Sequence, residues 1–261
     1  MKSKYFLGIR FWNDKTESLL VSADKTGGLF TVPSAPSLGA MDNDFFLARA
    51  YRASDWAVVD GGYVALILRF CLGQSIRRIS GLQLLQRLIG LGHNHPVPME
   101  DRKILWVVPN ANEQDSICNY LSQGNFELGK QHFYEAPLYK SDAEFSDQKL
   151  LAEIKIINPD WIIICIGGGR QEKLGYFIRQ HFEQFVRKPV ILCTGGAISF
   201  LTGTQASIPT WTDRLYLGWL MRIFSNPRLF GARYLDAAWR FPKLLWMSRK
   251  CLFAEGAEAG I

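Results

Sequence analysis

The sequence predicts an α/β protein with a Rossmann-like parallel sheet flanked by helices. Three observations carry this prediction. Short apolar runs rich in β-branched residues alternate with stretches of helical period, these runs are continuously hydrophobic, and several of them end directly in glycine. Continuous hydrophobicity is typical of strands that helices cover on both faces, as in a parallel sheet.

Five segments are expected to form the strands of this sheet. They are GLFTVP (28–33), WAVVD (56–60), ILWVVP (104–109), WIIICI (161–166) and VILCT (190–194). The proline-containing segment HNHPVPMEDRK (93–103) is expected to be a loop that links two halves of the α/β core.

Glycines follow three of the expected strands: Gly61 and Gly62 follow Asp60, Gly167 to Gly169 follow Ile166, and Gly195 and Gly196 follow Thr194. In open parallel sheets, ligands bind beyond the carboxyl ends of the strands, where helix N-termini offer N–H groups to phosphate. The three turns therefore predict one shared cleft. None of them matches the full GxGxxG or P-loop pattern, so a generic dinucleotide fingerprint is weak here.

The chain has 261 residues, of which 48% are hydrophobic, and this is enough for one sizeable core. Its five cysteines follow no CxxC spacing, and we expect buried thiols in a reducing compartment. The early apolar run YFLGI is soon interrupted by Arg10, Asn13 and Asp14, which argues against a secretory signal. The run YVALILRFCLG is about half of the ~20 residues that span a bilayer. We expect a cytoplasmic protein without a spanning segment.

The net charge of +6 is concentrated near the carboxyl end. Between Trp211 and Lys250, eight basic residues stand against two acidic ones, and nine aromatic residues are interleaved with them. The change in composition predicts two domains, an α/β domain over residues 1–210 and a helical appendage over residues 211–261. Within the appendage, an amphipathic helix is expected, with one apolar face and one charged flank. The face consists of Phe230, Tyr234, Ala237 and Phe241, and the flank of Arg233, Asp236 and Arg240.

Several longer segments carry a resemblance to a known family. They are VVDGG, QSIRRISG, PDWIIICIGGGRQEK, TGGAISFLTG and IPTWTDRLYLGWLMRIFSNPRLFGARYL. In order and spacing they resemble the WecG/TagA/CpsF glycosyltransferases, from about Gly8 to Tyr234. The resemblance implies inverting transfer of a sugar from a UDP-sugar to a polyprenyl-diphosphate-linked sugar in surface polysaccharide biosynthesis, with neither a metal ion nor a cofactor. It makes residues 1–210 the catalytic domain.

The resemblance also implies roles for two residues near the second expected strand. Asp60 is the expected catalytic base, which takes the proton from the acceptor hydroxyl as the hydroxyl attacks the anomeric carbon. From position alone, Asp60 serves equally well as a cap for the next helix. Arg78 is expected to grip a diphosphate, whereas Arg77 is expected to be its solvated neighbour. A surface position is the alternative for Arg78.

The donor is expected at the glycine turns, with Gly61, Gly167, Gly168, Gln171, Thr194, Gly195 and Gly196 as its ligands. Gln171, Glu172 and Lys173 match a Gln-Glu-Lys turn of the family, in which Gly169 replaces a proline. The Gln171 amide is expected to reach the phosphates or the sugar. As an alternative, this segment is an ordinary first helical turn with Glu at the positive end of the dipole. Glycine pairs such as Gly195 and Gly196 also occur for packing reasons alone.

The basic residues of the appendage are expected to hold the acceptor diphosphate, namely Arg214, Arg222, Arg228 and Arg233. The aromatic residues would rest in the headgroup region of an anionic membrane, with Trp239 and Trp246 at its surface. This places the protein peripherally on the inner face of the plasma membrane. The alternative is a C-terminal helical pair whose aromatic side chains pack on the core, as expected for Trp211 and Trp219.

Four positions depart from the family pattern. The family usually has Asn near Ser34, Asp near Gln83, Asp near Ser199 and Glu near Gly218. These replacements leave open which sugar is transferred, which acceptor receives it and whether activity is kept.

Other functions remain to be distinguished. The acidic pair Asp42 and Asp44 begins a helical stretch and is expected to serve the helix, so no metal site is predicted. A nucleotide-dependent oxidoreductase is disfavoured because the region after Gly61 lacks the acidic residue that would bind ribose. A basic module that binds nucleic acid or membrane without catalysis is the other alternative. Nucleic acid is not an expected partner, and the oligomeric state is open.

Overall fold

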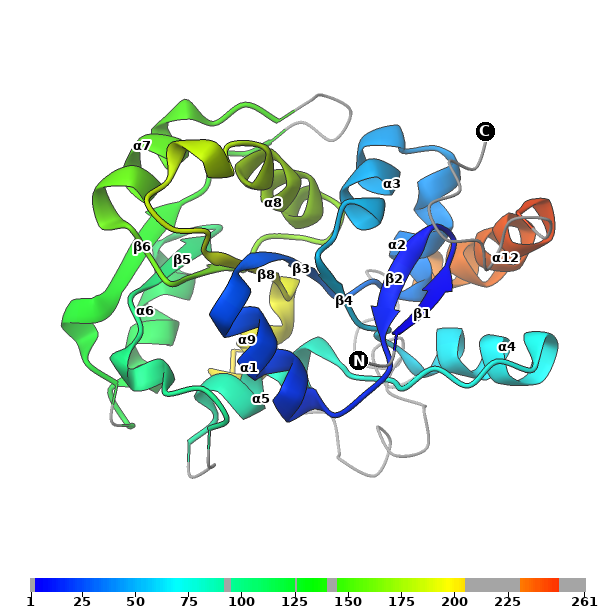
Figure 1. The fold of residues 1–261 in the computed structure, drawn as a ribbon, viewed down its shortest axis with the longest axis horizontal. Helices are drawn as coiled ribbons and strands as arrows, with labels where there is room; N and C mark the ends of the chain where they lie inside the picture. Colours follow the sequence, from blue (N-terminus) through cyan, green and yellow to red (C-terminus); the bar gives the residue numbers. More distant parts are fainter. Residues whose placement is uncertain (1–2, 92–94, 125, 140–144, 205–230, 249–261) are drawn as a thin grey trace.

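The computed structural model describes residues 3–91, 95–124, 126–139, 145–204 and 231–248. It contains one mostly parallel sheet with the strand order β1-β2-β4-β3-β8-β7-β5-β6 (Figure 1). The strands are β1 (Ser3–Phe6), β2 (Ile9–Trp12), β3 (Gly28–Thr31), β4 (Trp56–Ala57), β5 (Ile104–Val108), β6 (Gln131–Glu135), β7 (Trp161–Ile164) and β8 (Val190–Cys193). The α/β class predicted from the sequence is confirmed.

All five expected strands are present, and three further strands extend the sheet at its edges. β1 and β2 form an antiparallel hairpin, and β6 pairs in parallel with β5. β4 is shorter than expected. After Ala57 the strand continues only through single hydrogen bonds, from Val58 N to Thr31 O and from Asp60 N to Pro33 O, and through an isolated bridge between Val59 and Arg78.

Helices cover both faces of the sheet, as continuous hydrophobicity of the strands requires. One face packs against α1 (Thr16–Thr26), α5 (Gly81–Ile89), α6 (Ala111–Leu121) and α9 (Ile198–Leu201). The opposite face of β5, β7 and β8 packs against α7 (Gln148–Ile157) and α8 (Arg170–Gln180). The opposite face of β2 and β4 packs against α2 (Ala35–Gly39), α3 (Phe45–Arg52), α4 (Gly62–Leu72) and α12 (Ala232–Met247).

The sheet has two halves that meet where β3 pairs with β8. The chain completes β1 to β4, crosses to β5 through the segment that precedes Ile104, and then builds β5, β6 and β7. The expected linking loop at 93–103 lies in this crossover, with a short 3-10 turn at Met99–Asp101. β8, the last strand among the described residues, closes the gap between β3 and β7.

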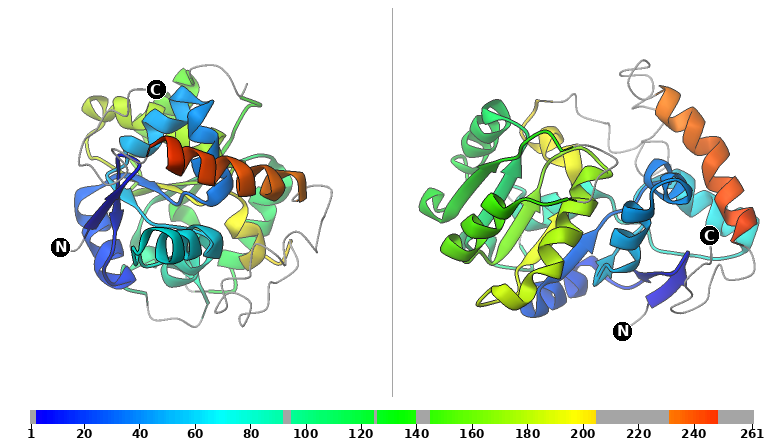
Figure 2. Two further views of the ribbon diagram at one scale, coloured as in Figure 1. Left: turned by 90° about the vertical axis from the view of Figure 1, so that its right-hand side faces the viewer. Right: turned by 90° about the horizontal axis from the view of Figure 1, so that it is seen from above.

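Helix α12 lies against the outside of the first half, beside α2 and α4 (Figure 2). Its residues Ala237 and Phe241 are buried, and the Phe241 ring meets Phe6 with the ring centroids 6.3 Å apart. On its flank, Arg240 donates to Asp236 at 2.7 Å. The expected apolar face and charged flank are therefore confirmed at these positions, whereas Phe230 lies outside the described residues.

The cysteines only partly follow the prediction. Cys165 and Cys193 are buried at the ends of β7 and β8, and burial raises the pKa of both thiols. Cys71 is exposed at the end of α4, so the expectation of a buried thiol was wrong there. The cause is that α4 projects beyond the sheet and leaves its last turn, including Phe70, in solvent. Cys251 lies outside the described residues.

Candidate active site

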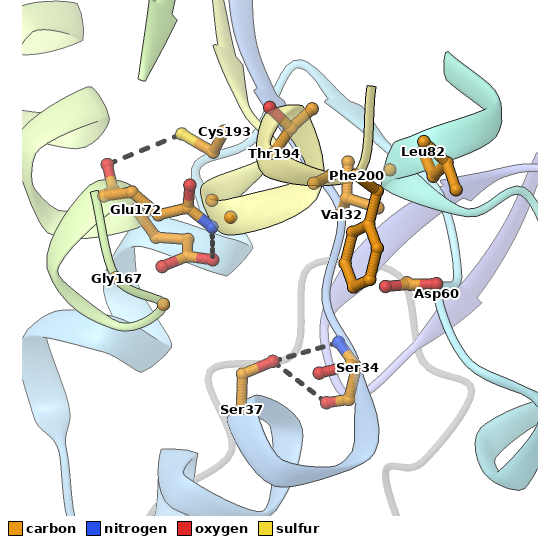
Figure 3. Close-up of a pocket in the computed structure, with 16 residues that line it drawn as sticks. Val32, Ser34, Ser37, Asp60, Leu82, Gly167, Glu172, Cys193, Thr194 and Phe200 are labelled. Atoms are coloured by element: carbon orange, nitrogen blue, oxygen red, sulfur yellow. Dashed lines mark hydrogen bonds between the residues drawn. The ribbon is translucent and has the colours of Figure 1, made fainter. Parts of the chain in front are cut away.

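One cavity of about 320 Å³ opens at the carboxyl ends of β3, β4, β7 and β8, across the seam between the two halves (Figure 3). It collects residues from the three glycine turns that are far apart in sequence. Of the expected site residues, those that line it are Asp60, Gly167, Gly168, Gln171, Thr194, Gly195 and Gly196. Val32, Leu82 and Phe200 supply apolar walls.

Asp60 is held at the carboxyl end of β4, where its backbone N–H donates to Pro33 O at 3.0 Å. It is half-buried, and in Figure 3 it lies across the cavity from Glu172 and Gly167. The N-cap position of α4 belongs to the next residue, Gly61, whose φ of 87° is accessible mainly to glycine. Asp60 therefore lies one residue before the helix cap and belongs to the wall of the cavity.

Arg78 and Gly61 lie next to the cavity and are not among the described residues that line it. The backbone of Arg78 runs beside Val59, and the following N–H of Ile79 donates to Val59 O at 3.1 Å. This register brings Arg78, which is half-buried, close to Asp60. Its neighbour Arg77 is exposed, as expected.

The turn after β7 is organised by a buried carboxylate. Glu172 is 2% exposed, and its oxygens accept hydrogen bonds from Gly169 N at 2.6 Å, Gln171 Nε2 at 3.0 Å and the Tyr51 hydroxyl at 3.1 Å. Burial raises the pKa of Glu172, and the donated hydrogen bonds limit the rise. The bond from Gly169, where φ is 86°, caps the start of α8. Glu172 thus fixes the shape of the turn that borders the cavity.

Gln171 and Thr194 each carry an unsatisfied polar atom at the cavity. Gln171 is 5% exposed, and its Oε1 atom has no hydrogen-bond partner within the described part of the chain. The same holds for Thr194 Oγ1. Between them lies Gly195 with a φ of 57°, where an added Cβ would come within 3.3 Å of Gln171 Nε2. The absence of a side chain at Gly195 leaves room for the Gln171 amide beside this turn.

Of the acidic pair noted in the sequence, Asp44 has structural partners. Asp44 is the N-cap of α3, where it accepts from Leu47 N at 3.0 Å, and its other oxygen pairs with the buried Lys173 Nζ at 2.5 Å. Within the described ranges, no cluster of three or more His, Cys, Asp or Glu side chains is arranged to hold a metal ion. The Asp44–Lys173 pair lines a second cavity of about 380 Å³, which shares Ser37 and Gly168 with the first.

The positions that depart from the family pattern have local partners. Ser34 lines the cavity and begins α2, where its backbone N–H donates to Ser37 Oγ at 3.0 Å. Gln83 closes a capping box with Ser80 at the start of α5. The Ser199 hydroxyl donates to Glu113 Oε1 at 2.9 Å, so a carboxylate from α6 stands beside Ser199. Gly218 lies outside the described residues.

Several functional candidates were not anticipated from the sequence. They are Ser37, Tyr51, Leu82, Glu113 and Phe200. Only Ser37 had a local signal, because a serine before Pro36 with another serine three residues later is typical of a helix start. The others reach the cavity region through contacts between distant segments.

The appendage is described only in part. Arg214, Arg222 and Arg228 lie outside the described residues, as does the side chain of Arg233. On α12, Trp239 and Trp246 are 77% and 68% exposed, on the side away from the buried Phe241. Among the described residues, no helix has the length and apolar character to cross a membrane.

The chain matches a family model and several characterised relatives. Residues 5–253 match the model described as "Glycosyl transferase WecG/TagA/CpsF family". Two relatives are named N-acetylglucosaminyldiphosphoundecaprenol N-acetyl-beta-D-mannosaminyltransferase. The one from Bacillus subtilis (strain 168) is 24% identical over 81% of this chain and 72% of its own length, and the one from Staphylococcus aureus (strain MRSA252) is 24% identical over 79% and 76%. Because the family model spans nearly the whole chain, this protein belongs to the WecG/TagA/CpsF family of glycosyl transferases.

Proposed function

We propose that this chain is an inverting glycosyltransferase that moves a sugar from a UDP-sugar to a sugar linked to polyprenyl diphosphate, without a metal ion. Family membership supports glycosyl transfer over the oxidoreductase and nucleic-acid alternatives. The names of the relatives support a lipid-diphosphate acceptor that ends in N-acetylglucosamine, and N-acetylmannosamine as the first sugar to test.

The observation that carries the proposal is the convergence of Asp60 with the glycine turns at 167 and 195 on one cavity. A carboxylate alone would support many reactions. Here the Asp60 carboxylate lies beside two glycine turns that lead into helices, and backbone N–H groups at such turns bind phosphate. A base next to a phosphate-binding turn is the arrangement that transfer from a nucleotide sugar needs.

The proposed reaction has one displacement step. Asp60 takes the proton from the acceptor hydroxyl, and the hydroxyl oxygen forms a bond to the anomeric carbon. The bond from that carbon to the diphosphate oxygen breaks on the opposite face, and UDP leaves with the electron pair. The configuration at the anomeric carbon is inverted, and the proton passes from Asp60 to solvent.

Positive groups of the protein are proposed to replace a metal ion. Arg78, next to Asp60, would contact the leaving diphosphate, because a guanidinium suits phosphate oxygens. Arg214, Arg222, Arg228 and Arg233 would hold the diphosphate of the acceptor.

The membrane is proposed to meet the face formed by α12 and α4. These helices are adjacent, because the Tyr63 hydroxyl donates to Ala238 O at 3.2 Å. Both expose large apolar side chains, with Phe70 on α4 and Trp239 and Trp246 on α12. Exposed tryptophans next to a basic segment favour the interface of an anionic membrane. The protein would act peripherally at the cytoplasmic face.

The direct test is release of UDP by the purified chain. We expect release from UDP-N-acetylmannosamine only when N-acetylglucosaminyl-diphosphoundecaprenol is supplied, at the same rate with and without EDTA. Release that is independent of the acceptor would contradict transfer, and strong inhibition by EDTA would contradict a metal-free mechanism. A panel of UDP-sugars, compared by the rise in melting temperature, would identify the donor, because ligands that bind only the native state stabilise it.

A further inference from the structure

A second cavity, of about 380 Å³, adjoins the cavity that contains Asp60. Ser37 and Gly168 line both of them, so the two spaces meet at these residues. In Figure 3, Ser37 and Asp60 both border the first cavity. The volume of the second cavity lies within the range of small-molecule sites, which is roughly 300–1,000 Å³. A ligand that fills it can therefore extend past Ser37 towards the proposed catalytic base.

The wall of the second cavity combines charged and apolar side chains. Among the described residues, the charged ones are Asp44, Arg170, Lys173 and Asp236, and the apolar ones are Pro36, Ala40 and Leu47. A pyranose ring has the same mixed character, because its hydroxyls form hydrogen bonds while its C–H faces are apolar. Small-molecule sites likewise combine apolar walls with a few convergent polar groups. The lining therefore suits a sugar.

The charges of this lining are balanced. The buried Lys173 Nζ is paired with Asp44 Oδ2 at 2.5 Å, so these two charges compensate each other. One basic and one acidic side chain are left, Arg170 and Asp236, of which Asp236 also accepts from Arg240 Nε at 2.7 Å. Sites for a diphosphate gather several positive groups or N–H donors. The second cavity therefore suits the neutral part of a substrate, whereas the glycine turns of the first cavity suit phosphate.

The second cavity borders helix α12. Asp236 of α12 lines it, whereas no described residue of α12 lines the first cavity. The helix packs closely on α2, because a Cβ added at Gly39 would lie 3.2 Å from Arg240 Cβ. It also exposes Trp239 and Trp246, which are proposed to meet the membrane. Of the two cavities, the second is thus the one next to the helix that would approach a lipid-linked substrate.

We propose that the second cavity binds the sugar of the acceptor, while the sugar nucleotide occupies the first cavity. The reactive hydroxyl of the acceptor sugar then passes Ser37 to reach Asp60. Arg170 donates to oxygens of this sugar, Asp236 accepts from its O–H or N–H groups, and Leu47 lies against its apolar face. The inference rests on the proposed function, because it requires a sugar linked to polyprenyl diphosphate. It adds a site for that sugar, separate from the residues proposed for the two diphosphates.

Binding without turnover tests this inference. The full chain, saturated with UDP, is titrated with two water-soluble ligands: N-acetylglucosaminyl diphosphate on a short prenyl chain, and the same prenyl diphosphate without the sugar. UDP-N-acetylmannosamine is titrated alone. The variants are Arg170→Gln, which removes an exposed cation, and Ala40→Phe, which places a ring in the cavity. Both should weaken the sugar-bearing prenyl ligand about tenfold and leave the other two ligands unchanged.

Arg87→Gln is the matched control, because Arg87 is also an exposed arginine but lies on α5, where it pairs with Glu17 at 2.8 Å. This variant should bind all three ligands as wild type does. An equal loss in Arg87→Gln and Arg170→Gln overturns the inference, because the effect is then not specific to the cavity. Arg170→Gln changes an exposed side chain, so its result counts even if Ala40→Phe does not fold.

The ligand that weakens tells which substrate group the cavity holds. An equal loss for the prenyl diphosphate without sugar overturns the inference, because the cavity then binds the diphosphate. A loss for UDP-N-acetylmannosamine overturns it as well, because the cavity then belongs to the donor. If wild type binds neither UDP-N-acetylmannosamine nor the sugar-bearing prenyl ligand, the proposed function fails together with the inference. If it binds both and the two variants bind them equally well, only the inference fails.

Discussion

Asp60 and Glu172 are two carboxylates on one cavity, and their surroundings give them different roles. Glu172 is almost fully buried and already accepts three hydrogen bonds. Asp60 is half-buried at the opposite wall, within reach of a ligand in the cavity. A general base must reach the proton that it removes. Asp60 is therefore the carboxylate to test for catalysis.

For Asp60→Asn, we expect turnover in the UDP-release assay to fall by about two to four orders of magnitude. The reason is that the asparagine amide cannot remove the proton from the hydroxyl of the acceptor sugar. The melting temperature should be unchanged, because the asparagine side chain has the same shape as aspartate and residue 60 is only half-buried. Asp101→Asn, which replaces an exposed aspartate before the start of β5, at the end of the sheet opposite the cavity, is the control and should have wild-type activity. Full turnover in Asp60→Asn would remove this residue from the mechanism.

The raised pKa of Glu172 predicts a pH dependence of stability. At a pH between 4.5, the ordinary pKa of a glutamate, and the raised pKa of the folded state, Glu172 has lost its proton in the unfolded state and still holds it in the folded state. Stability from this group is therefore present below pH 4.5 and is lost as pH rises through the folded pKa. Glu172→Gln removes this contribution, so its melting temperature should rise relative to wild type as pH increases. Melting curves of both proteins at matched pH values measure this, and parallel profiles would contradict it.

For individual residues, the sequence predicted the positions of those that directly follow strands. It did not predict those whose hydrogen-bond partners are far away in the sequence. Asp60, Gln171 and Gly195 were foreseeable because the end of a parallel strand fixes where the next residues lie. The bond between Tyr51 and Glu172 joins positions 121 apart, and that between Ser199 and Glu113 joins positions 86 apart. No local pattern encodes such pairs, because they follow from the packing of α3 on α8 and of α6 on α9.

Among the elements, the central strands were predictable and the edge strands were not. β5, β7 and β8 are buried on both faces, and this makes their sequences continuously apolar. β6 has the sequence QHFYE, with the buried Gln131 accepting from Trp106 Nε1 at 2.9 Å and Glu135 exposed. An edge strand pairs on one side only, so its sequence need not be apolar throughout.

Helix α8 approaches the sheet so closely that Gly175 has no room for a side chain. An added Cβ would lie 2.7 Å from Leu29 Cδ1 and 3.0 Å from Cys193 Sγ. We expect Gly175→Ala to destabilise the fold by about 1–3 kcal/mol, because the helix must shift. Urea unfolding measures the change. Gly129→Ala, whose new Cβ meets nothing closer than 4.0 Å, should have little effect, and equal losses in both variants would contradict the packing argument.

For the whole molecule, the exposed tryptophans of α12 predict how it meets a membrane. Replacing both Trp239 and Trp246 by serine should weaken binding to anionic vesicles about tenfold, because apolar anchoring is lost while the buried face of α12 is kept. Co-sedimentation measures the bound fraction. The control replaces Ile156 and Val186, which are 79% and 91% exposed, by serine. Equal vesicle binding by the tryptophan variant and wild type would contradict the assigned face.

The position of β8 has a consequence for biosynthesis. Among the strands that the structure describes, it is the last to leave the ribosome, yet it occupies the centre of the sheet, between β3 and β7. Until residues 190–193 emerge, the nascent chain holds two incomplete half-sheets, each with an open apolar edge that invites pairing with other chains. Translation arrest or proteolysis before residue 190 should yield fragments that aggregate and do not bind nucleotides. A chaperone that covers the open edges is needed most just before this strand is made.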